Sequence, residues 1–250
     1  MKKKINKLFI RIFACFIPNR QLRDFVRLCR FGRYKITGEN NVIMFAGHKL
    51  PRFLKIPGLK IIINGQNNLI TIGKNSKFSN CYFMLTHDAQ NVNISVGDNC
   101  ELVSSIVLCA WSRDTTVHIG NKCHFYGAHI YAGGNDIHVH IGNDVLMANP
   151  VYIWGGDGHA VIDRDTNMVI NCSKKPLVIS DHVWLGQGSR VLKNGNLPPN
   201  TVVAADAVVT KTFTEEFTIL AGNPAKVIKR NVMWDEVSPY WKDRELRGDV

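Results

Sequence analysis

The sequence predicts an all-β fold in which short strands turn a corner every six residues and form the rungs of a prism. Two observations predict it: a recurring seven-residue signature and an aliphatic ladder with a period of six. Such a period fits neither a helical stripe nor a simple alternating strand. The signature occurs as IGKNSKF at 72–78, VGDNCEL at 96–102, IGNKCHF at 119–125, IGNDVLM at 141–147, ISDHVWL at 179–185 and LPPNTVV at 197–203. The ladder consists of Ile179, Leu185, Val191, Leu197, Val203 and Val209.

The first 35 residues are a strongly basic segment ahead of these repeats. They hold eleven Lys and Arg residues and one acid, Asp24, out of 31 basic and 20 acidic residues in a chain of net charge +11. The remainder is therefore nearly neutral, which argues against a nucleic-acid-binding domain. The 45% share of hydrophobic residues excludes a disordered chain.

Pro18 divides residues 5–35 into two short amphipathic helices in our prediction. Arg11 interrupts the apolar run and no small-residue cleavage site follows, so we expect the segment to be retained rather than removed as a signal peptide. Two interpretations stay open. The helices bind an anionic membrane surface, or they cap the end of the prism or a neighbouring subunit. The sequence contains no run of 18 apolar residues, so we expect no membrane-spanning helix.

Residues 36–70 contain four glycines between apolar runs, and we expect irregular early coils there. In the repeats that follow, each copy supplies an inward aliphatic residue, a corner of Gly, Asn or Asp, and then a small residue. Cysteines at two small positions predict core packing rather than redox chemistry or metal binding. Seven cysteines without a Cys-x-x-Cys pair favour buried thiols in a reducing cytoplasm. The small positions hold Ser76, Cys100, Cys123, Val145, Val183 and Thr201.

These repeats resemble those of the hexapeptide-repeat acyltransferases, over roughly residues 70–230. The resemblance implies a left-handed parallel β-helix of three hexads per coil, here a catalytic domain at 36–220 followed by a segment at 221–250 that closes a coenzyme A site. It further implies an acetyl-CoA-dependent O-acetyltransferase of the polysaccharide and galactoside type, assembled as a homotrimer with sites between neighbouring prisms.

The spacing of 38 residues between the fourth and fifth copies marks an insertion at 155–177. Loops held on a rigid scaffold often carry catalytic groups. GDGHAVID in this loop resembles the family segment that carries the catalytic histidine, which points to His159 as the general base. A neutral imidazole can remove a proton from an acceptor hydroxyl near pH 7. Asp157, Asp163 or a backbone carbonyl would orient the ring, and the sequence leaves these alternatives open.

The last coils resemble the family's coenzyme A site. HVWLGQG at 182–188, VVAADAVVTK at 202–211 and AGNPAKVIKR at 221–230 carry this resemblance. Gln187 and Asp206 depart from it, because the family usually has a small residue or Gly there. Lysines suit the nucleotide phosphates as cationic point charges. The implied contacts with acetyl-CoA are Trp184, Gly186, Gln187, Ala205, Thr210, Lys211, Lys226 and Lys229.

On the acceptor side we expect Asp136, Asn149 and Trp154. The resemblance favours a hydroxyl of a bacterial surface polysaccharide or of its lipid-linked precursor, modified in the cytoplasm or at the inner face of the cytoplasmic membrane. A free sugar or amino sugar is the alternative acceptor.

Two other classes use the same fold. A zinc carbonic anhydrase is suggested by His87, His124 and His129, although His124 sits at a different point of its hexad from that family's ligand. The other class is a binding protein without catalysis. We expect no metal, because the insertion and the coenzyme A segments are foreign to the carbonic anhydrase.

Overall fold

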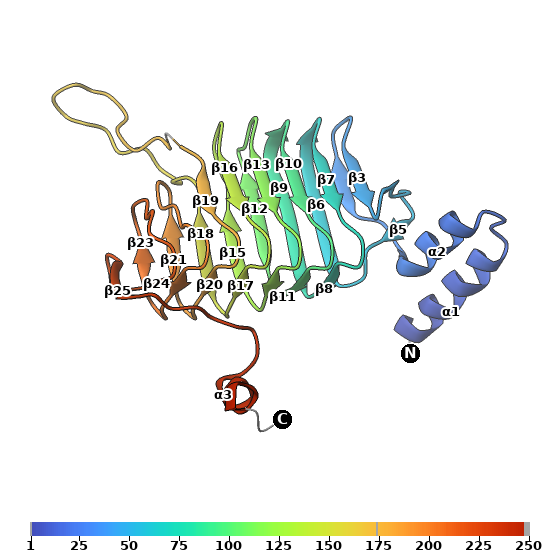
Figure 1. The fold of residues 1–250 in the computed structure, drawn as a ribbon. Helices are drawn as coiled ribbons and strands as arrows, with labels where there is room; N and C mark the ends of the chain where they lie inside the picture. The colour runs from blue at the N-terminus through green and yellow to red at the C-terminus, as the bar shows by residue number, and fades with distance from the viewer. Residues whose placement is uncertain (1, 174, 248–250) are drawn as a thin grey trace.

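The computed structural model describes residues 2–173 and 175–247. They form a parallel β-helix, a three-sided prism that confirms the fold predicted from the six-residue period (Figure 1). Helices α1 (Lys2–Cys15) and α2 (Arg20–Leu28) lie at the N-terminal end of the prism, as the break at Pro18 predicted. Helix α3 (Pro239–Arg247) follows the last coil. None of the helices in the described part of the chain is long and apolar enough to cross a membrane.

Three sheets form the faces of the prism, and we number the faces in the order in which each coil visits them. Face 1 contains β3 (Val42–Phe45), β4 (His48–Lys49), β7 (Leu69–Ile72), β10 (Asn93–Val96), β13 (Thr116–Ile119), β16 (His138–Ile141) and β19 (Leu177–Ile179). Face 2 contains β8 (Lys77–Ser79), β11 (Glu101–Val103), β14 (His124–Phe125), β17 (Leu146–Met147), β20 (Trp184–Leu185), β22 (Val202–Val203), β24 (Thr218–Ala221) and β25 (Lys226–Arg230). Face 3 contains β2 (Lys35–Thr37), β6 (Leu59–Gln66), β9 (Cys81–Gln90), β12 (Ile106–Ala110), β15 (Ala128–Tyr131), β18 (Val151–Trp154), β21 (Arg190–Leu192) and β23 (Val208–Val209).

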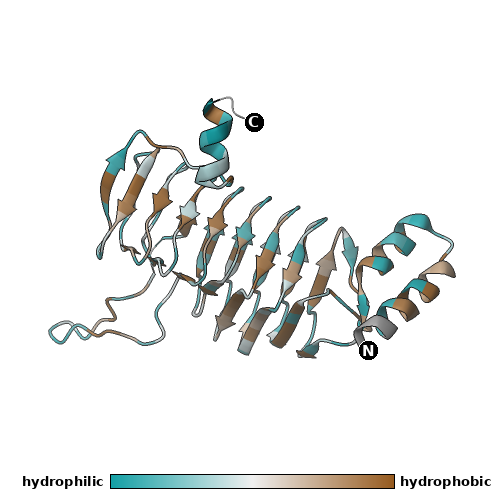
Figure 2. Cartoon of the chain, turned by 90° about the horizontal axis from the view of Figure 1, so that it is seen from below, coloured by the Kyte–Doolittle hydropathy of each residue, from teal (hydrophilic) through white to brown (hydrophobic). Residues whose placement is uncertain are grey.

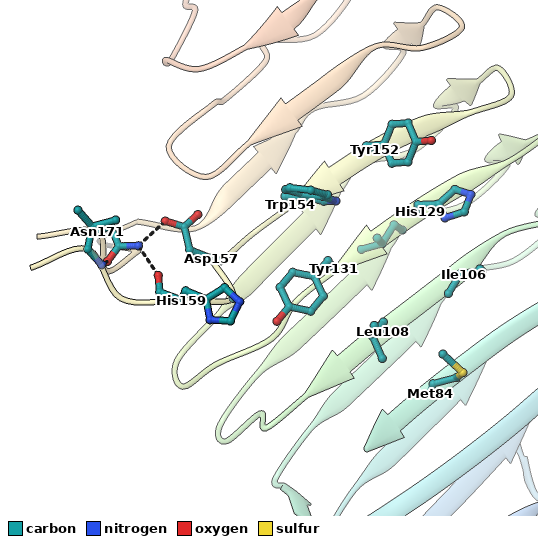
Figure 3. A pocket seen from close by; sticks show the side chains of 14 residues that line it. Met84, Ile106, Leu108, His129, Tyr131, Tyr152, Trp154, Asp157, His159 and Asn171 are labelled. Carbon is teal, nitrogen blue, oxygen red and sulfur yellow. Dashed lines mark hydrogen bonds between the residues drawn. The ribbon is translucent and has the colours of Figure 1, made fainter. Parts of the chain in front are cut away.

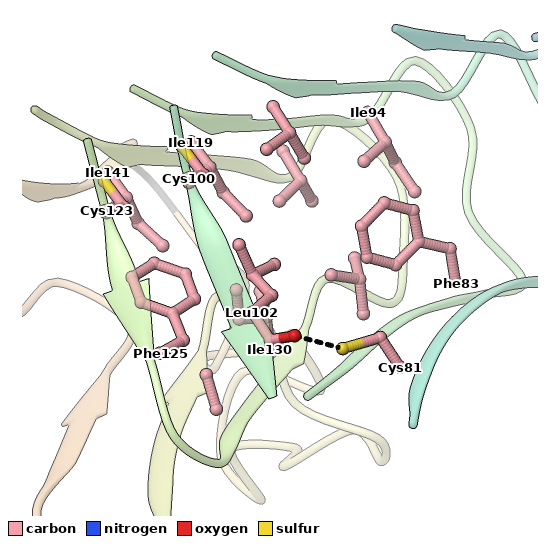
Figure 4. Close-up of a cluster of buried hydrophobic side chains, with 14 of the residues drawn as sticks. Cys81, Phe83, Ile94, Cys100, Leu102, Ile119, Cys123, Phe125, Ile130 and Ile141 are labelled. Carbon is pink, nitrogen blue, oxygen red and sulfur yellow. Dashed lines mark hydrogen bonds between the residues drawn. The ribbon is translucent and has the colours of Figure 1, made fainter. Parts of the chain in front are cut away.

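Consecutive coils stack in register, so the first aliphatic residue of each repeat lies above that of the previous one. On face 1 this column contains Ile72, Val96, Ile119, Ile141 and Ile179, all buried. Inward side chains from the other faces, including Phe83 and Phe125, meet this column inside the prism (Figure 4). Side chains alternate between inward and outward along each strand, so the outward side chains are free to form binding surfaces.

Asn and Asp recur in the repeats because they join neighbouring coils at the corner between faces 1 and 2. Oδ1 of Asp98 accepts a hydrogen bond from the backbone N–H of Lys74 at 2.6 Å. Asn121 accepts from Asp98 in the same way at 2.8 Å. The pattern continues with Asn143 accepting from Asn121 at 2.9 Å and Asp181 accepting from Asn143 at 2.7 Å. Each corner is thereby tied to the next one.

In the first three repeats the small residue is buried, and its side chain donates a hydrogen bond to the following coil. Ser76 donates its hydroxyl to the carbonyl of Gly97 at 2.7 Å. The thiols of Cys100 and Cys123 donate to the carbonyls of Gly120 and Gly142 at 3.1 and 3.2 Å. Both cysteines are buried, as the core-packing interpretation predicted.

The N-terminal coil is more regular than the sequence suggested. β3 pairs with β7 over four consecutive residue pairs, and β2 pairs with β6. Only β4 and the short antiparallel pair of β1 (Arg30–Phe31) with β5 (Leu54–Lys55) depart from the coil. Beneath this coil, the inner faces of the two helices join the core through Ile10, Ala14, Phe25 and Val26.

The predicted insertion lies between β18 and β19 and spans residues 155–176. It leaves the prism at the corner between faces 3 and 1, while β16 and β19 still pair as neighbouring rungs. Figure 1 shows the loop extending away from the prism, near the end opposite to α1 and α2. The scaffold therefore carries one large excursion, at the place where the sequence predicted catalytic groups.

Candidate active site

The outer part of the loop is a small hairpin closed by its own hydrogen bonds. Ile162 and Val169 form an antiparallel bridge. Asp163 organises the turn, since its Oδ1 accepts from the backbone and the hydroxyl of Thr166, both at 2.8 Å. These hydrogen bonds lower the pKa of Asp163. The hydrogen-bond partners of Asp163 in the described residues thus belong to the turn. Asp163 was one candidate to orient the imidazole of His159, and the structure describes both residues without a bond between them.

The base of the loop is fastened to the next coil by Asp157, Asn171 and Lys193. Lys193 follows β21 and donates to Oδ2 of Asp157 at 2.6 Å, and also to the backbone carbonyl of Asn171. The side-chain amide of Asn171 donates to Asp157 at 2.7 Å and to the carbonyl of His159 at 2.8 Å, and its Oδ1 accepts from Val161 at 2.8 Å.

The ionisation of Asp157 follows from these contacts. Burial alone would raise its pKa, but hydrogen bonds from Lys193 and Asn171 and the positive charge of Lys193 outweigh burial and lower it. The carboxylate stays ionised and holds both strands of the loop base. No sequence motif pointed to Asn171 or Lys193 as residues of the site. The available signal was the position of Lys193, directly after a strand of the aliphatic ladder and at the corner where the insertion leaves the prism.

His159 projects from this fixed base into a cavity of about 720 Å³ on the outer side of face 3 (Figure 3). The floor of the cavity is formed by outward side chains of four successive strands, and the loop forms one wall. Arg190 lies over the ring of Tyr152, with 5.4 Å between its guanidinium carbon and the ring centroid. The principal lining residues are Met84, Leu108, Tyr131, Tyr152, Trp154 and His159.

A second cavity of about 340 Å³ lies on the other side of the loop base. Gly133, Gly134 and Asn135 from the preceding coil face Asn171 and Cys172 across it, and His159 lines it as well. The imidazole therefore stands at the boundary between two hollows, an apolar one on face 3 and a more polar one at the corner between faces 3 and 1. Two reactants can approach such a group from different sides.

The structure places the predicted acceptor residues at three different positions. Trp154 ends β18, is half exposed and lines the larger cavity together with His159. Asp136 lies at the same corner one coil earlier, but its carboxylate bonds to Nε2 of His138 at 2.9 Å. Asn149 lies at the corner between faces 2 and 3, close to Gly127, and within the described residues it lines neither cavity. One chain thus brings only Trp154 to the imidazole.

Several predicted coenzyme A residues meet at the corner between faces 2 and 3. Two coils approach closely there: a Cβ on Gly186 would lie 2.8 Å from the backbone nitrogen of Ala205. Glycine is therefore required at this point. Asp206 turns the neighbouring corner with a φ of 56° and donates its N–H to the carbonyl of Gln187 at 2.8 Å. The departures from the family pattern, Gln187 and Asp206, thus lie in stacked turns of two successive coils that one hydrogen bond joins.

Thr210 and Lys211 lie at a different corner. They follow β23 where faces 3 and 1 meet, as Lys193 follows β21. They are exposed, and Lys211 lies over the ring of Phe213 at 5.4 Å. Lys226 and Lys229 are also exposed, on β25 at the last rung of face 2. The predicted coenzyme A residues thus occupy two edges and the end of the prism, rather than one pocket of a single chain.

Trp184 lies on face 2, where the chain after β25 returns and covers part of it. The indole of Trp234 stacks on His182, with 4.2 Å between ring centroids, and lies 6.2 Å from Trp184. Nε1 of Trp234 donates to the carbonyl of His182 at 2.9 Å. We name residues 231–238 the strap. Trp184 keeps 39% of its surface exposed beside it.

The three histidines of the carbonic anhydrase alternative have separate partners. His87 stacks on Trp111 at 4.0 Å, His124 bonds to Glu236 of the strap, and His129 packs against Tyr152. Among the residues that the structure describes, no group of three or more His, Cys, Asp or Glu side chains is arranged to hold a metal ion.

The chain is similar to known acetyltransferases. No family model matches the chain. It is 28% identical over 201 residues to the polysialic acid O-acetyltransferase of Neisseria meningitidis, a match that covers 80% of this chain and 88% of that enzyme. It is 30% identical over 141 residues to the polysialic acid O-acetyltransferase of Escherichia coli O1:K1, where the match covers 56% of this chain and spans only 44% of the relative.

The fold comparison agrees with the sequence comparison. A crystal structure of a polysialic acid O-acetyltransferase superposes with a TM-score of 0.69 at 26% identity, covering 87% of this chain and 99% of that one. The similarity therefore extends over nearly the whole prism rather than over a few coils.

Proposed function

We propose that this chain, which is similar to polysialic acid O-acetyltransferases in sequence and fold, is a hexapeptide-repeat β-helix acetyltransferase and transfers an acetyl group from acetyl-CoA to a hydroxyl of a bacterial surface polysaccharide. The observation that carries the proposal is the position of His159. It stands on a loop fastened by Lys193 and Asn171, beside an aromatic cavity of about 720 Å³. Positioning of this kind supplies much of the rate of a two-substrate reaction.

The reaction proceeds in one ternary complex. Neutral His159 takes the proton of the acceptor hydroxyl as its oxygen attacks the thioester carbonyl. Backbone N–H groups stabilise the oxyanion that forms on the carbonyl oxygen. The C–S bond then breaks, and the CoA sulfur takes the proton from the imidazolium, which leaves O-acetyl acceptor, CoA and neutral histidine. Asp157 supports this sequence by holding the loop rather than by exchanging protons.

Acetyl-CoA fits the predicted residues in chemical character. Gly186 and Ala205 are small residues at this corner, which suits a narrow pantetheine arm that passes over it, and Trp184 offers an exposed apolar surface. Exposed Lys211, Lys226 and Lys229 supply positive charges for the phosphates. The arm and the phosphates are bound by side chains at the edges of the prism.

The acceptor is proposed from the relatives and from the cavity. Both sequence relatives are named for polysialic acid, so polysialic acid and related surface polysaccharides, or their lipid-linked precursors, are the first acceptors to test. Trp154, Tyr131 and Tyr152 give broad apolar faces on which sugar rings can pack. Seven free cysteines suit a reducing compartment, and we place the reaction in the cytoplasm.

We further propose that the working enzyme is a homotrimer. The outer surface of face 3 carries Met84, Ile106 and Leu108, half-buried apolar side chains beside the cavity. Apolar surface of this kind favours association. A neighbouring prism would cover it and bring its own coenzyme A residues toward His159, since one chain leaves them at separate edges. Light scattering tests this: a particle of three 28.1 kDa chains is expected, and a monomer at working concentration contradicts it.

The decisive experiment measures CoA release and acetylated product with purified protein. Polysialic acid, other capsular and lipopolysaccharide fragments and free sugars serve as acceptors. His159→Ala should lower kcat by about 10²- to 10⁴-fold. His87→Ala, which removes an exposed histidine elsewhere on the prism, is the matched control and should leave kcat unchanged. Full activity of the His159→Ala enzyme would refute the assignment, and preference for free sugars would redirect the acceptor.

A further inference from the structure

The N-terminal helices are fixed to the prism by their inner faces. Ile10 and Ala14 of α1 and Phe25 and Val26 of α2 are buried in the common core. Asn6 exchanges two hydrogen bonds with the backbone of Phe31, at 3.1 and 3.2 Å. Capping of the prism, one of the two alternatives that the sequence left open for these helices, is therefore what the structure shows. It determines which side of α1 remains uncovered.

The uncovered side of α1 is apolar. Leu8, Phe9, Ile12, Phe13 and Phe16 follow one another at helical spacing and have exposed fractions of 60, 61, 49, 44 and 80%. In a soluble chain, such residues normally face a core. Here they form one continuous exposed strip.

The strip continues onto the end of the prism. The ring of Phe13 lies 5.8 Å from that of Phe31 and 6.4 Å from that of Phe53, and Phe53 is itself 47% exposed. The apolar surface is therefore held by aromatic contacts to a rigid support and is not a frayed helix end. We name Leu8, Phe9, Ile12, Phe13, Phe16 and Phe53 the apolar strip.

Exposed basic side chains lie on the two N-terminal helices, the first of which carries most of the apolar strip. Lys7 and Arg11 lie on α1 and Arg20 and Arg27 on α2, all exposed. Asp24, the only acid of the first 35 residues, is paired with Arg20 at 3.9 Å and with Arg27 at 3.2 Å. Figure 2 shows hydrophobic and hydrophilic residues interleaved on these two helices at the end of the prism. The surface thus combines exposed apolar side chains with exposed basic ones, which we name the basic border.

We propose that this surface docks the enzyme on an anionic lipid bilayer. Exposed aromatic and aliphatic side chains enter the headgroup region, and the basic border pairs with acidic headgroups. A neutral partner would leave the border without counter-charge, and a second copy would bring two surfaces of the same sign together. Charge complementarity therefore selects the anionic bilayer as the occupant.

Flotation with vesicles tests the docking. Intact protein is mixed at low salt with phosphatidylcholine vesicles that contain or lack one third phosphatidylglycerol. We expect the protein to float with the anionic vesicles, at least tenfold less with neutral ones, and at least tenfold less at 1 M salt. Absence of flotation with anionic vesicles at low salt overturns the proposal.

Two pairs of variants localise the effect. Ile12→Ser/Phe16→Ser should reduce binding at least tenfold, whereas Tyr240→Ser/Leu246→Ser, which removes exposed apolar groups from α3, should not. Lys7→Glu/Arg11→Glu should reduce binding, whereas Lys77→Glu/Lys122→Glu, with the same change in net charge on the prism, should not. Equal losses in both members of a pair would contradict docking through the helices.

Two further readouts separate docking from folding, assembly and catalysis. Circular dichroism of Ile12→Ser/Phe16→Ser should match that of the unchanged protein, and so should acetyl transfer to a soluble acceptor. Light scattering should give the same mass for both. A smaller particle for the variant would assign the apolar strip to a contact between copies and overturn the membrane proposal.

Discussion

Nζ of Lys193 lies 2.6 Å from Oδ2 of Asp157, so one coil of the prism holds the loop that grows from the coil before it. The two residues are 36 positions apart in the chain, and the lysine side chain is 19% exposed. This contact converts a long insertion into a support for His159, whose own backbone carbonyl is held by Asn171.

Loss of this contact should impair catalysis more than stability. Lys193→Met keeps the length of the side chain but removes its charge, and Asp157 then lacks its main partner. We expect kcat to fall about 10- to 100-fold, since misplacement of a catalytic group by about 1 Å has effects of this size. Lys193→Arg should restore part of the loss, and the melting temperature should change little. A loss of thermal stability that matches the loss of kcat would contradict a positioning role.

The pH dependence of the loop follows from the lowered pKa of Asp157. A carboxyl whose pKa is lower in the folded than in the unfolded state contributes stability above its ordinary value of 3.8 and loses it as pH falls through the lowered pKa. We expect the loop to resist limited proteolysis from pH 7 down to about pH 4 and to open only in stronger acid. The loop of Asp157→Asn should already be open at pH 7. Similar cleavage of both proteins at every pH would be incompatible with this account.

Substitution of two tryptophans should distinguish the binding sites of the two substrates. Trp154 lines the cavity beside His159, and Trp184 lies on face 2 next to the strap. We expect Trp154→Ala to raise the KM for the acceptor about tenfold, equivalent to about 1.4 kcal/mol, and Trp184→Ala to raise the KM for acetyl-CoA. Initial rates with each substrate varied in turn give this comparison. An exchange of the two effects would reverse the assignment of the sites.

Direct transfer requires no thiol nucleophile. Cys172 is exposed in the loop, whereas Cys81, Cys100, Cys109 and Cys123 are buried, and burial raises the pKa of Cys109 to about 12. Cys172→Ala should keep kcat within about twofold, and initial-rate plots should intersect because both substrates bind before chemistry. Parallel plots together with an inactive Cys172→Ala enzyme would indicate an acetyl-cysteine intermediate instead.

The corner ladder should contribute to the stability of the prism. Asn121 accepts from the N–H of Asp98 and donates to Oδ1 of Asn143 at 3.0 Å. Asn121→Ala removes both bonds and should lower the free energy of unfolding by about 1–2 kcal/mol. Asn121→Asp keeps the acceptor and should cost less. Urea unfolding of the three proteins measures the difference, and equal stability of the alanine variant would show that water replaces the ladder.

The repeats could be predicted because their chemistry is local. Gly, Asn and Asp at fixed spacing mark each corner, and the same side chains form the ladder through Asn121, Asn143 and Asp181. The interruption of this spacing locates the loop without any knowledge of its shape. The role proposed for His159 rests on the resemblance of GDGHAVID to a short family segment.

The contacts that organise the site could not be predicted, because they depend on where separate segments meet in space. The pairing of Lys193 with Asp157 requires that the insertion leave the prism at the corner where β21 ends. The stacking of Trp234 on His182 requires the chain after β25 to turn back along face 2. No local pattern specifies either path. The regular pairing of β3 within residues 36–70 was missed for the same reason, because β3 gains it from β7.

The separation of the helices from the loop gives the prism a further property, that of a spacer. On face 3, β2 and β18 are five strand-to-strand steps apart, about 24 Å along the axis. If the apolar strip lies on a bilayer as proposed and the prism stands away from it, an acceptor anchored in the same bilayer would have to extend past these coils to meet His159. Insertion or deletion of one coil would then change the distance that such an acceptor has to span.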